Sequence, residues 1–233
     1  MSEPAPSAAT RIARLRWAVR VYRHPSALLL VVQLAGLLLY PFIESTTAGN
    51  LVYGVVGITV LVVTMRMVHK TSGHRAYIAL ALAVAVVVLN VATMRAPGIL
   101  AWAAATEAAF YFYAAASLIR YMLADTRATT DEIFCAGATF TLLAWAFTYV
   151  FVACQALQPG CFASAVNSDA PRTWTELAYL SFALLSSTGI GDVIPLTRQA
   201  RSLAAFEMFV GVMYLALVVS RLVGLALVRK AQE

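Results

Sequence analysis

The stretch Tyr179–Pro195 carries the residues whose types and spacing suit chemistry, and it reads Y-L-S-F-A-L-L-S-S-T-G-I-G-D-V-I-P. Gly189 and Gly191 tolerate left-handed backbone angles that other residues resist, and Ser186–Thr188 favour local hydrogen bonds over helix. A loop of this kind can turn successive carbonyl oxygens to one side. Such oxygens can replace the hydration shell of a small cation. The stretch therefore predicts a backbone that coordinates a cation.

A short apolar segment must position this loop. Trp174–Leu185 has about 12 residues, whereas crossing a bilayer takes about 20. Thr173 and Glu176 have the spacing of a capping box, which starts a helix. Because non-helical backbone at membrane depth is tolerated only where it is buried or lines water, we expect a re-entrant helix whose C-terminal dipole end faces the cation path.

The composition excludes a soluble globular fold. Of the 233 residues, 61% are hydrophobic and 12% are charged, against roughly 45–50% and about 25% in soluble domains. Six apolar runs are long enough to be membrane spans: Ser26–Ile43, Leu51–Val68, Ala76–Met94, Gly98–Leu123, Ile133–Cys154 and Leu203–Val228.

The positively charged residues indicate how these spans are oriented. Under alternation of six spans, Arg95, Arg172, Arg198 and Arg201 fall on one side, and every other Lys and Arg falls on the opposite side. Cytoplasmic loops carry the excess of Lys and Arg. We therefore expect a multi-pass protein of the plasma (inner) membrane with both termini in the cytoplasm. The net charge of +6 then reflects topology and membrane lipids, and no nucleic acid partner is expected.

The loop carries a family resemblance. Ser186–Asp192 resembles the selectivity-filter signature T-T-V-G-Y-G-D of the potassium channel superfamily. The similarity continues through Val193–Pro195, Ala200–Ala204, Tyr214–Ala216 and Ser220–Gly224, and the run looks like the pore module of small prokaryotic ion channels. It covers roughly Ile133–Val228.

The resemblance implies an all-α membrane protein with six transmembrane helices plus one re-entrant pore helix and filter loop, in a tetrameric channel architecture. Residues 1–25 would be a cytoplasmic basic segment, 26–125 a four-helix voltage-sensor-like domain, and 131–230 the pore domain. The fourth span lacks the Arg series of a voltage sensor. A homotetramer would conduct potassium, or monovalent cations more broadly, with no enzymatic activity and no cofactor beyond the permeant ions. The sequence indicates no gating ligand.

The resemblance also implies roles for single residues. Ser187, Thr188, Gly189, Ile190 and Gly191 would coordinate the ions, and Asp192 would brace the filter with Tyr179 as a partner. Gly211 would be a gating hinge or a point of close helix packing. Three positions depart from the signature, because Ile190 replaces its tyrosine, Thr188 its valine and Ser187 its threonine. These departures bear on selectivity for potassium over sodium.

Other polar residues in apolar segments leave alternatives open. Glu207 either hydrogen-bonds behind the filter or tunes cation occupancy, or it pairs with Arg201 or Arg198, and Glu107 is either functional or structural. Cys154 and Cys161 lie in a compartment that permits a disulfide, but two free thiols fit equally well. The three cysteines do not form a zinc-site pattern, so no metal site other than potassium at the filter is expected.

Two other function classes compete with a channel. A transporter or a non-conducting membrane subunit fits the composition, but a transporter favours paired broken helices and only one interrupted segment is visible. Gly189–Asp192 also matches the G-x-G-D string of intramembrane aspartyl proteases. That chemistry needs a second aspartate at membrane depth, and Asp125, Asp131 and Asp169 are predicted elsewhere.

Overall fold

The computed structural model describes residues 25–43, 62, 64, 76–124, 130–164 and 170–230. Its helices are α2 (Pro25–Ile43), α4 (Ala76–Thr93), α5 (Leu100–Ala124), α6 (Thr130–Leu157), α7 (Trp174–Leu185) and α8 (Arg198–Lys230). A 3₁₀ turn, η2 (Pro97–Ile99), precedes α5, and the strands β1 (Phe162–Ser164) and β2 (Val193–Pro195) complete the fold.

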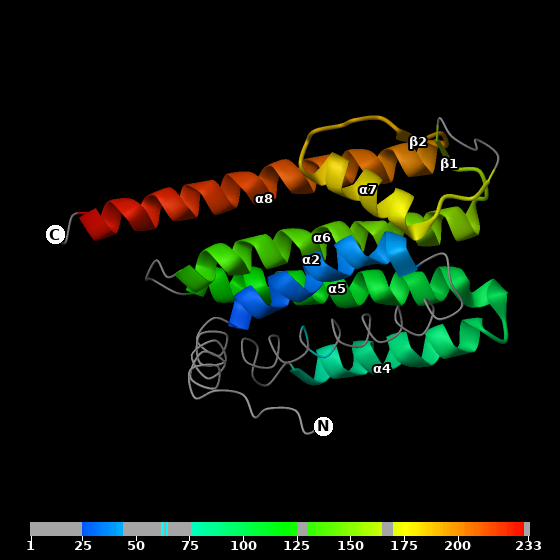
Figure 1. The fold of residues 1–233 in the computed structure, drawn as a ribbon, viewed down its shortest axis with the longest axis horizontal. Coiled ribbons are helices and arrows are strands. Elements are labelled where there is room, and N and C mark those ends of the chain that lie inside the picture. The colour runs from blue at the N-terminus through cyan, green and yellow to red at the C-terminus, as the bar shows by residue number, and fades with distance from the viewer. Residues whose placement is uncertain are drawn as a thin grey trace, which may run out of the picture.

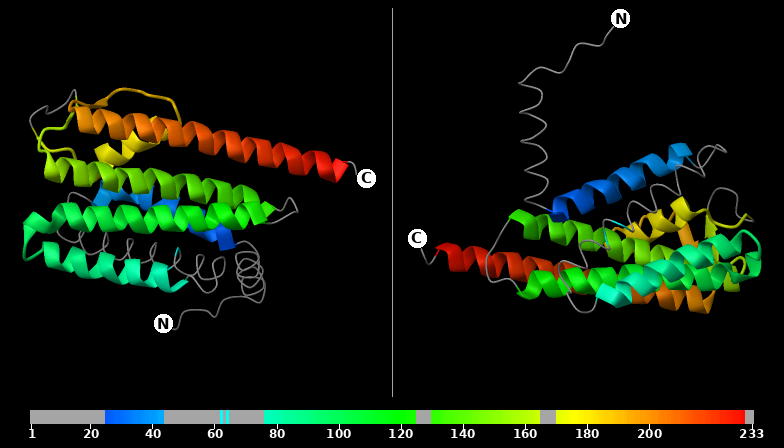
Figure 2. Two further views of the ribbon diagram at one scale, coloured as in Figure 1. Left: turned by 180° about the vertical axis from the view of Figure 1, so that it is seen from behind. Right: turned by 90° about the horizontal axis from the view of Figure 1, so that it is seen from below.

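Helix α6 is the centre of the arrangement, because it packs against α2, α5, α7 and α8. Figures 1 and 2 show α4 and α8 on opposite sides of the α5–α6 pair, with the short α7 between α6 and α8. The larger apolar core lies among α2, α4, α5 and α6 and reaches Leu185 and Tyr214. A second core holds the C-terminal end of α6, α7 and the two strands together.

Polar contacts fix the starts of the helices. The Asp131 carboxylate, at the start of α6, accepts hydrogen bonds from the Ser26 backbone N–H (3.3 Å) and hydroxyl (2.9 Å) at the start of α2. The Thr197 hydroxyl accepts from the Ala200 N–H (3.3 Å) and so caps α8. These caps satisfy backbone donors that a helix start leaves without partners.

Two long-range contacts set how α8 lies against α6. The Tyr214 hydroxyl donates to the Ala136 carbonyl at 2.6 Å. One to two turns further along α8, Arg221 forms an ion pair with Glu132 at 2.9 Å, and the Glu132 side chain is 2% exposed. The two helices are therefore joined near the end of α6 that the charge pattern predicts to be cytoplasmic.

The strands are a difference from the predicted all-helical fold. β1 and β2 pair antiparallel, with Phe162 opposite Pro195 and Ser164 opposite Val193. The Leu196 N–H extends the pairing by donating to the Cys161 carbonyl at 2.8 Å. The backbone that leaves the loop needs partners for its polar groups, and it finds them on the segment that follows α6.

The helices agree with most of the predicted spans. Each predicted range except Leu51–Val68 coincides with a described helix, and Leu51–Val68 lies outside the described residues, apart from Val62 and Thr64, which are helical. Within the described part, Asp131–Leu157 and Arg198–Gly224 are long and apolar enough to cross a membrane. That α2, α4, α5 and the predicted span Leu51–Val68 also cross, giving six spans, stays a prediction, as do the domain boundaries and the cytoplasmic segment 1–25.

The ion pair between α6 and α8 yields a test of the fold. Arg221→Met leaves the buried Glu132 carboxylate without this cation, and breaking such a pair costs about 3 kcal/mol of unfolding free energy. The double variant Arg221→Met with Glu132→Gln removes the charge as well and recovers most of the loss. Thermal unfolding of the detergent-solubilised protein measures both. Equal stability of the single and double variants would contradict this account.

Candidate functional site

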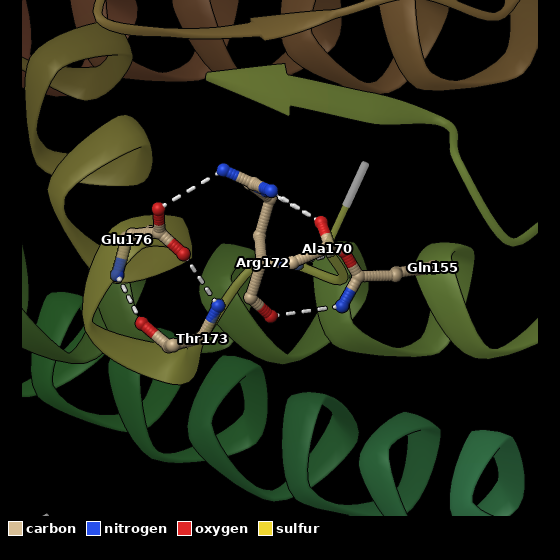
Figure 3. A network of polar contacts seen from close by, with 5 residues as sticks. All are labelled: Gln155, Ala170, Arg172, Thr173 and Glu176. Atoms are coloured by element: carbon tan, nitrogen blue, oxygen red, sulfur yellow. Dashed lines mark hydrogen bonds and ion pairs between the residues drawn. The ribbon is translucent and has the colours of Figure 1, made fainter. Parts of the chain in front are cut away.

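Helix α7 begins at a network of polar groups, shown in Figure 3. The Thr173 hydroxyl accepts from the Glu176 N–H at 3.3 Å, and the Glu176 carboxylate accepts from the Thr173 N–H at 2.7 Å. Both halves of the predicted capping box are thus present, and α7 spans Trp174–Leu185 as predicted. At about 1.5 Å per residue, this helix is about 18 Å long and cannot cross a membrane.

Arg172 ties this start of α7 to the end of α6. Its guanidinium pairs with Glu176 at 3.1 Å and donates to the Ala170 carbonyl. Its backbone N–H donates to the Gln155 side chain at 2.8 Å, and its carbonyl accepts from the same side chain at 2.9 Å. The Arg172 residue is 4% exposed. The buried cation therefore holds the entry to α7 against α6 with its charge paired.

The end of α7 turns directly into the loop. The Ala183 carbonyl accepts from the N–H groups of Thr188 and Gly189, each at 3.0 Å, and from the Thr188 hydroxyl at 3.2 Å. The Ser186 hydroxyl donates to the Phe182 carbonyl at 2.6 Å and lies 3.0 Å from the Thr188 hydroxyl. The first turn of the loop is thus closed back onto carbonyls that the helix end leaves without partners.

The loop backbone alternates in handedness. Ser187, Gly189 and Gly191 have φ angles of 60°, 57° and 77°, and Thr188 and Ile190 between them do not have positive φ. A strand has no such alternation of φ, and its successive carbonyls point in opposite directions. Ser187 is the only non-glycine residue with positive φ in the described part of the chain. The backbone therefore alternates between left-handed and other conformations from Ser187 to Gly191.

The side of the loop away from α7 is open in the single chain. Residues 187–192 are all exposed, whereas Leu185 before them and Val193 after them are buried. Asp192 and Tyr179 are both exposed, and no hydrogen bond joins them within the described residues. The bracing pair that the resemblance implies stays a prediction.

A seam between α7 and α8 lies behind the loop. The Ser181 hydroxyl is 2.5 Å from the Glu207 carboxyl, and one turn later on both helices Leu185 meets Gly211. A Cβ atom built on Gly211 would lie 2.2 Å from the Leu185 carbonyl oxygen. Gly211 therefore allows the backbones of α7 and α8 to touch. This supports close packing, the second of the two roles predicted for it.

The described residues decide between the alternatives for Glu207. Its predicted pairing with Arg201 or Arg198 is wrong, because both arginines are exposed and Arg201 donates to the Pro195 carbonyl at 3.2 Å. The carboxyl is turned inward to Ser181 instead, as the other alternative predicted. Glu107 is also buried, and it accepts a hydrogen bond of 2.5 Å from Asn90 on α4.

Cys154 and Cys161 lie side by side as thiols. Their sulfur atoms are 3.7 Å apart at the outer end of α6 and the start of β1, and both residues are buried. Burial, first, and then the nearby Cys154 raise the pKa of the Cys161 thiol to about 12. The thiolate is the reactive form, so this pair reacts slowly once folded. A disulfide between them stays a prediction.

One comparison with known proteins decides the family. A family model described as an ion channel matches residues 108–227, which is more than half of the chain. The chain belongs to the potassium channel superfamily. The match runs from within α5, starting at residue 108, through α6, α7 and the loop into α8. Neither a curated protein nor a solved structure matches the chain.

Membership of this superfamily makes the protein an ion channel of the membrane. It argues against an enzyme such as the aspartyl protease that the G-x-G-D string raised. Sequence reasoning did not single out Ser181, Gln155 or the burial of Arg172, whose polar contacts join α7 to its neighbouring helices. The capping box adjacent to Arg172 was a local signal, but the burial of the guanidinium depends on α6, which comes earlier in the chain.

Gly211 gives a test with a matched control on the same helix. Gly211→Ala forces α8 away from the Leu185 carbonyl, and overpacking of this kind costs about 2 kcal/mol. Gly224→Ala, also on α8, places its Cβ where nothing lies within 4 Å. We expect a lower unfolding temperature and weaker ion flux for Gly211→Ala only. If both variants behave alike, the contact between α7 and α8 is not tight.

Proposed function

We propose that this channel conducts potassium, or monovalent cations more broadly, passively through a filter made of the backbone of residues 187–191. Carbonyl oxygens of Ser187, Thr188, Gly189, Ile190 and Gly191 would replace the hydration shell of the ion. The observation that carries the proposal is the positive φ at Ser187, Gly189 and Gly191, alternating with residues of negative φ. Such an alternation would allow the carbonyls of these residues to face one axis.

The filter would form in a homotetramer. One loop per chain cannot surround an ion, so several copies have to meet around an axis. The exposed run of residues 187–192 and the exposed apolar side chains of α8 support this. Those side chains include Phe206, Phe209, Val212, Met213 and Val219. Contact with neighbouring subunits and with lipid would cover them.

Helix α7 would add an electrostatic contribution. Its C-terminus leads into the loop, and the carbonyl end of a helix carries a partial negative charge that favours a cation. The Ala183 carbonyl is satisfied locally by Thr188 and Gly189, so the loop stays attached to this helix end. Thr188, where the superfamily signature has valine, thus adds a hydrogen bond at the start of the proposed filter.

The remaining architecture would follow the membrane topology. Six spans and a re-entrant α7 would place the loop at the outer face and both termini in the cytoplasm. The division of Lys and Arg between the two sides supports this orientation, because cytoplasmic loops carry the excess of positive charge. Helix α5 carries Glu107 and Arg120 and no Arg series, so steep voltage gating is not part of the proposal.

Gly189 tests the filter against a matched glycine elsewhere. Gly189 and Gly160 both have positive φ, 57° and 79°, and in both cases a Cβ would have nothing within 4 Å. Substituting valine therefore imposes similar backbone strain at either site. In liposomes with a potassium gradient, we expect Gly189→Val to abolish flux and Gly160→Val to retain it.

Two outcomes of these flux measurements would contradict the proposed function. Wild-type flux in Gly189→Val, from protein that inserts and assembles normally, would remove residues 187–191 from the conduction path. Wild-type protein that forms tetramers but passes neither potassium nor sodium would support the non-conducting membrane subunit instead.

Ile190 tests selectivity. The signature tyrosine at this position carries a hydroxyl, and isoleucine cannot make its hydrogen bond. Ile190→Tyr is expected to raise the ratio of potassium to sodium permeability, measured as paired flux with each ion. An unchanged ratio would mean that the carbonyl geometry alone sets the selectivity.

A further inference from the structure

Glu207 is a carboxylic acid enclosed between three helices. It lies on α8 with 0% of the residue exposed. Its Oε1 atom is 2.5 Å from the hydroxyl oxygen of Ser181 on α7, and that same hydroxyl oxygen is 2.7 Å from the Ala144 carbonyl on α6. One serine hydroxyl therefore sits where α6, α7 and α8 meet.

Counting hydrogens identifies the donor in this contact. A serine hydroxyl has one hydrogen to donate. The Ala144 carbonyl can only accept, and an ionised carboxylate can only accept as well. If Glu207 were ionised, one of two close oxygen pairs would have no hydrogen between them. If Glu207 carries its proton, the acid donates to Ser181 and Ser181 donates to Ala144, so both contacts are satisfied.

The surroundings provide nothing to hold a negative charge there. The second carboxyl oxygen of Glu207 is buried and has no hydrogen-bond partner among the described residues. The nearest arginines along α8, Arg198 and Arg201, are exposed, and Arg201 donates to the Pro195 carbonyl. A buried charge without a partner is strongly unfavourable. A neutral acid leaves only one carboxyl oxygen without a hydrogen bond, which costs less.

We propose that Glu207 is a positioning residue, held as a neutral acid, that links α8 through Ser181 to α6 and so sets the placement of α7 and its loop. The proposal rests on the proposed filter function of residues 187–191. Ser181 lies less than two turns before the loop, and the next contact along the same seam is Leu185 against Gly211. A shift of α7 at Ser181 therefore moves the carbonyls that would line the ion path.

The protonation of Glu207 is tested first by infrared spectroscopy of the full-length protein in lipid at neutral pH. The difference spectrum between wild type and Glu207→Gln should show the loss of a protonated-carboxyl C=O band. Glu107→Gln is the matched control, because Glu107 is another glutamate buried on a helix and makes no ion pair among the described residues. Loss of carboxylate bands in place of the protonated band would overturn the proposal. This measurement does not depend on ion flux.

The positioning role is tested by a set of conservative and disruptive variants. Glu207→Gln keeps a neutral side chain that can donate to Ser181, so its potassium-to-sodium permeability ratio and tetramer stability should stay close to those of wild type. Ser181→Ala leaves the buried Glu207 acid without its acceptor, and Glu207→Leu removes the link from α8 to Ser181, so each should lower the conducting fraction by about fivefold or more. The double variant Ser181→Ala with Glu207→Leu removes both partners, and its loss should be smaller than the sum of the two single losses.

The outcomes separate this inference from the filter proposal. A Glu207→Gln channel that fails as Glu207→Leu does would mean that the negative charge is required, which overturns the neutral-acid role. If Gly189→Val conducts like wild type, the filter proposal fails, and the infrared spectrum and tetramer stability of the Glu207 variants still decide whether the acid is neutral and links the helices. Additive losses in the double variant would contradict the shared contact.

Discussion

The central constraint on this molecule is that α7, a helix too short to cross a membrane, has to be held in a fixed place against longer helices. α7 has 12 residues, and at the membrane depth proposed for it the polar backbone that follows would have no water partner in hydrocarbon. Each end of α7 is therefore fastened to something else. Arg172, Gln155 and the capping box hold its start, and hydrogen bonds to the Ala183 carbonyl close its end. The packing of α6 and α8 against α7 meets this requirement.

The position of α6 and α8 can be understood from the same constraint. α6 supplies the Ala144 carbonyl to α7 and the Ala136 carbonyl to α8, and both bonds are 2.7 Å or shorter. α8 supplies the glycine that lets the backbones touch at Leu185. Helices in lipid lack a strong hydrophobic drive to associate, so they depend on small residues and on hydrogen bonds between them. The seam between α7 and α8 has both, with Gly211 as the small residue and a hydrogen bond between Ser181 and Glu207.

The loop combines strain with exposure. Ser187 holds a left-handed backbone angle that only glycine adopts without cost, and it does so beside two glycines that share this conformation. Residues 187–192 are exposed. A strained, exposed backbone is stable only where the surroundings hold it in place, and here α7, the β1–β2 pair and Thr197 hold it from one side. Neighbouring subunits of the proposed tetramer would hold the other.

The sequence by itself determined what depends on neighbouring residues. The apolar runs predicted the described helices, and the start and end of α7 agree with the prediction because a capping box and a Ser-Ser-Thr-Gly sequence are local signals. The G-x-G spacing likewise predicted the left-handed positions at Gly189 and Gly191, though not at Ser187. Only the tertiary structure decided the partners of the buried polar groups. Ser181 meets Glu207 26 positions away, Tyr214 meets Ala136 78 positions away, and Arg221 meets Glu132 89 positions away. These contacts depend on which helix faces pack together, and no local pattern of residues specifies that.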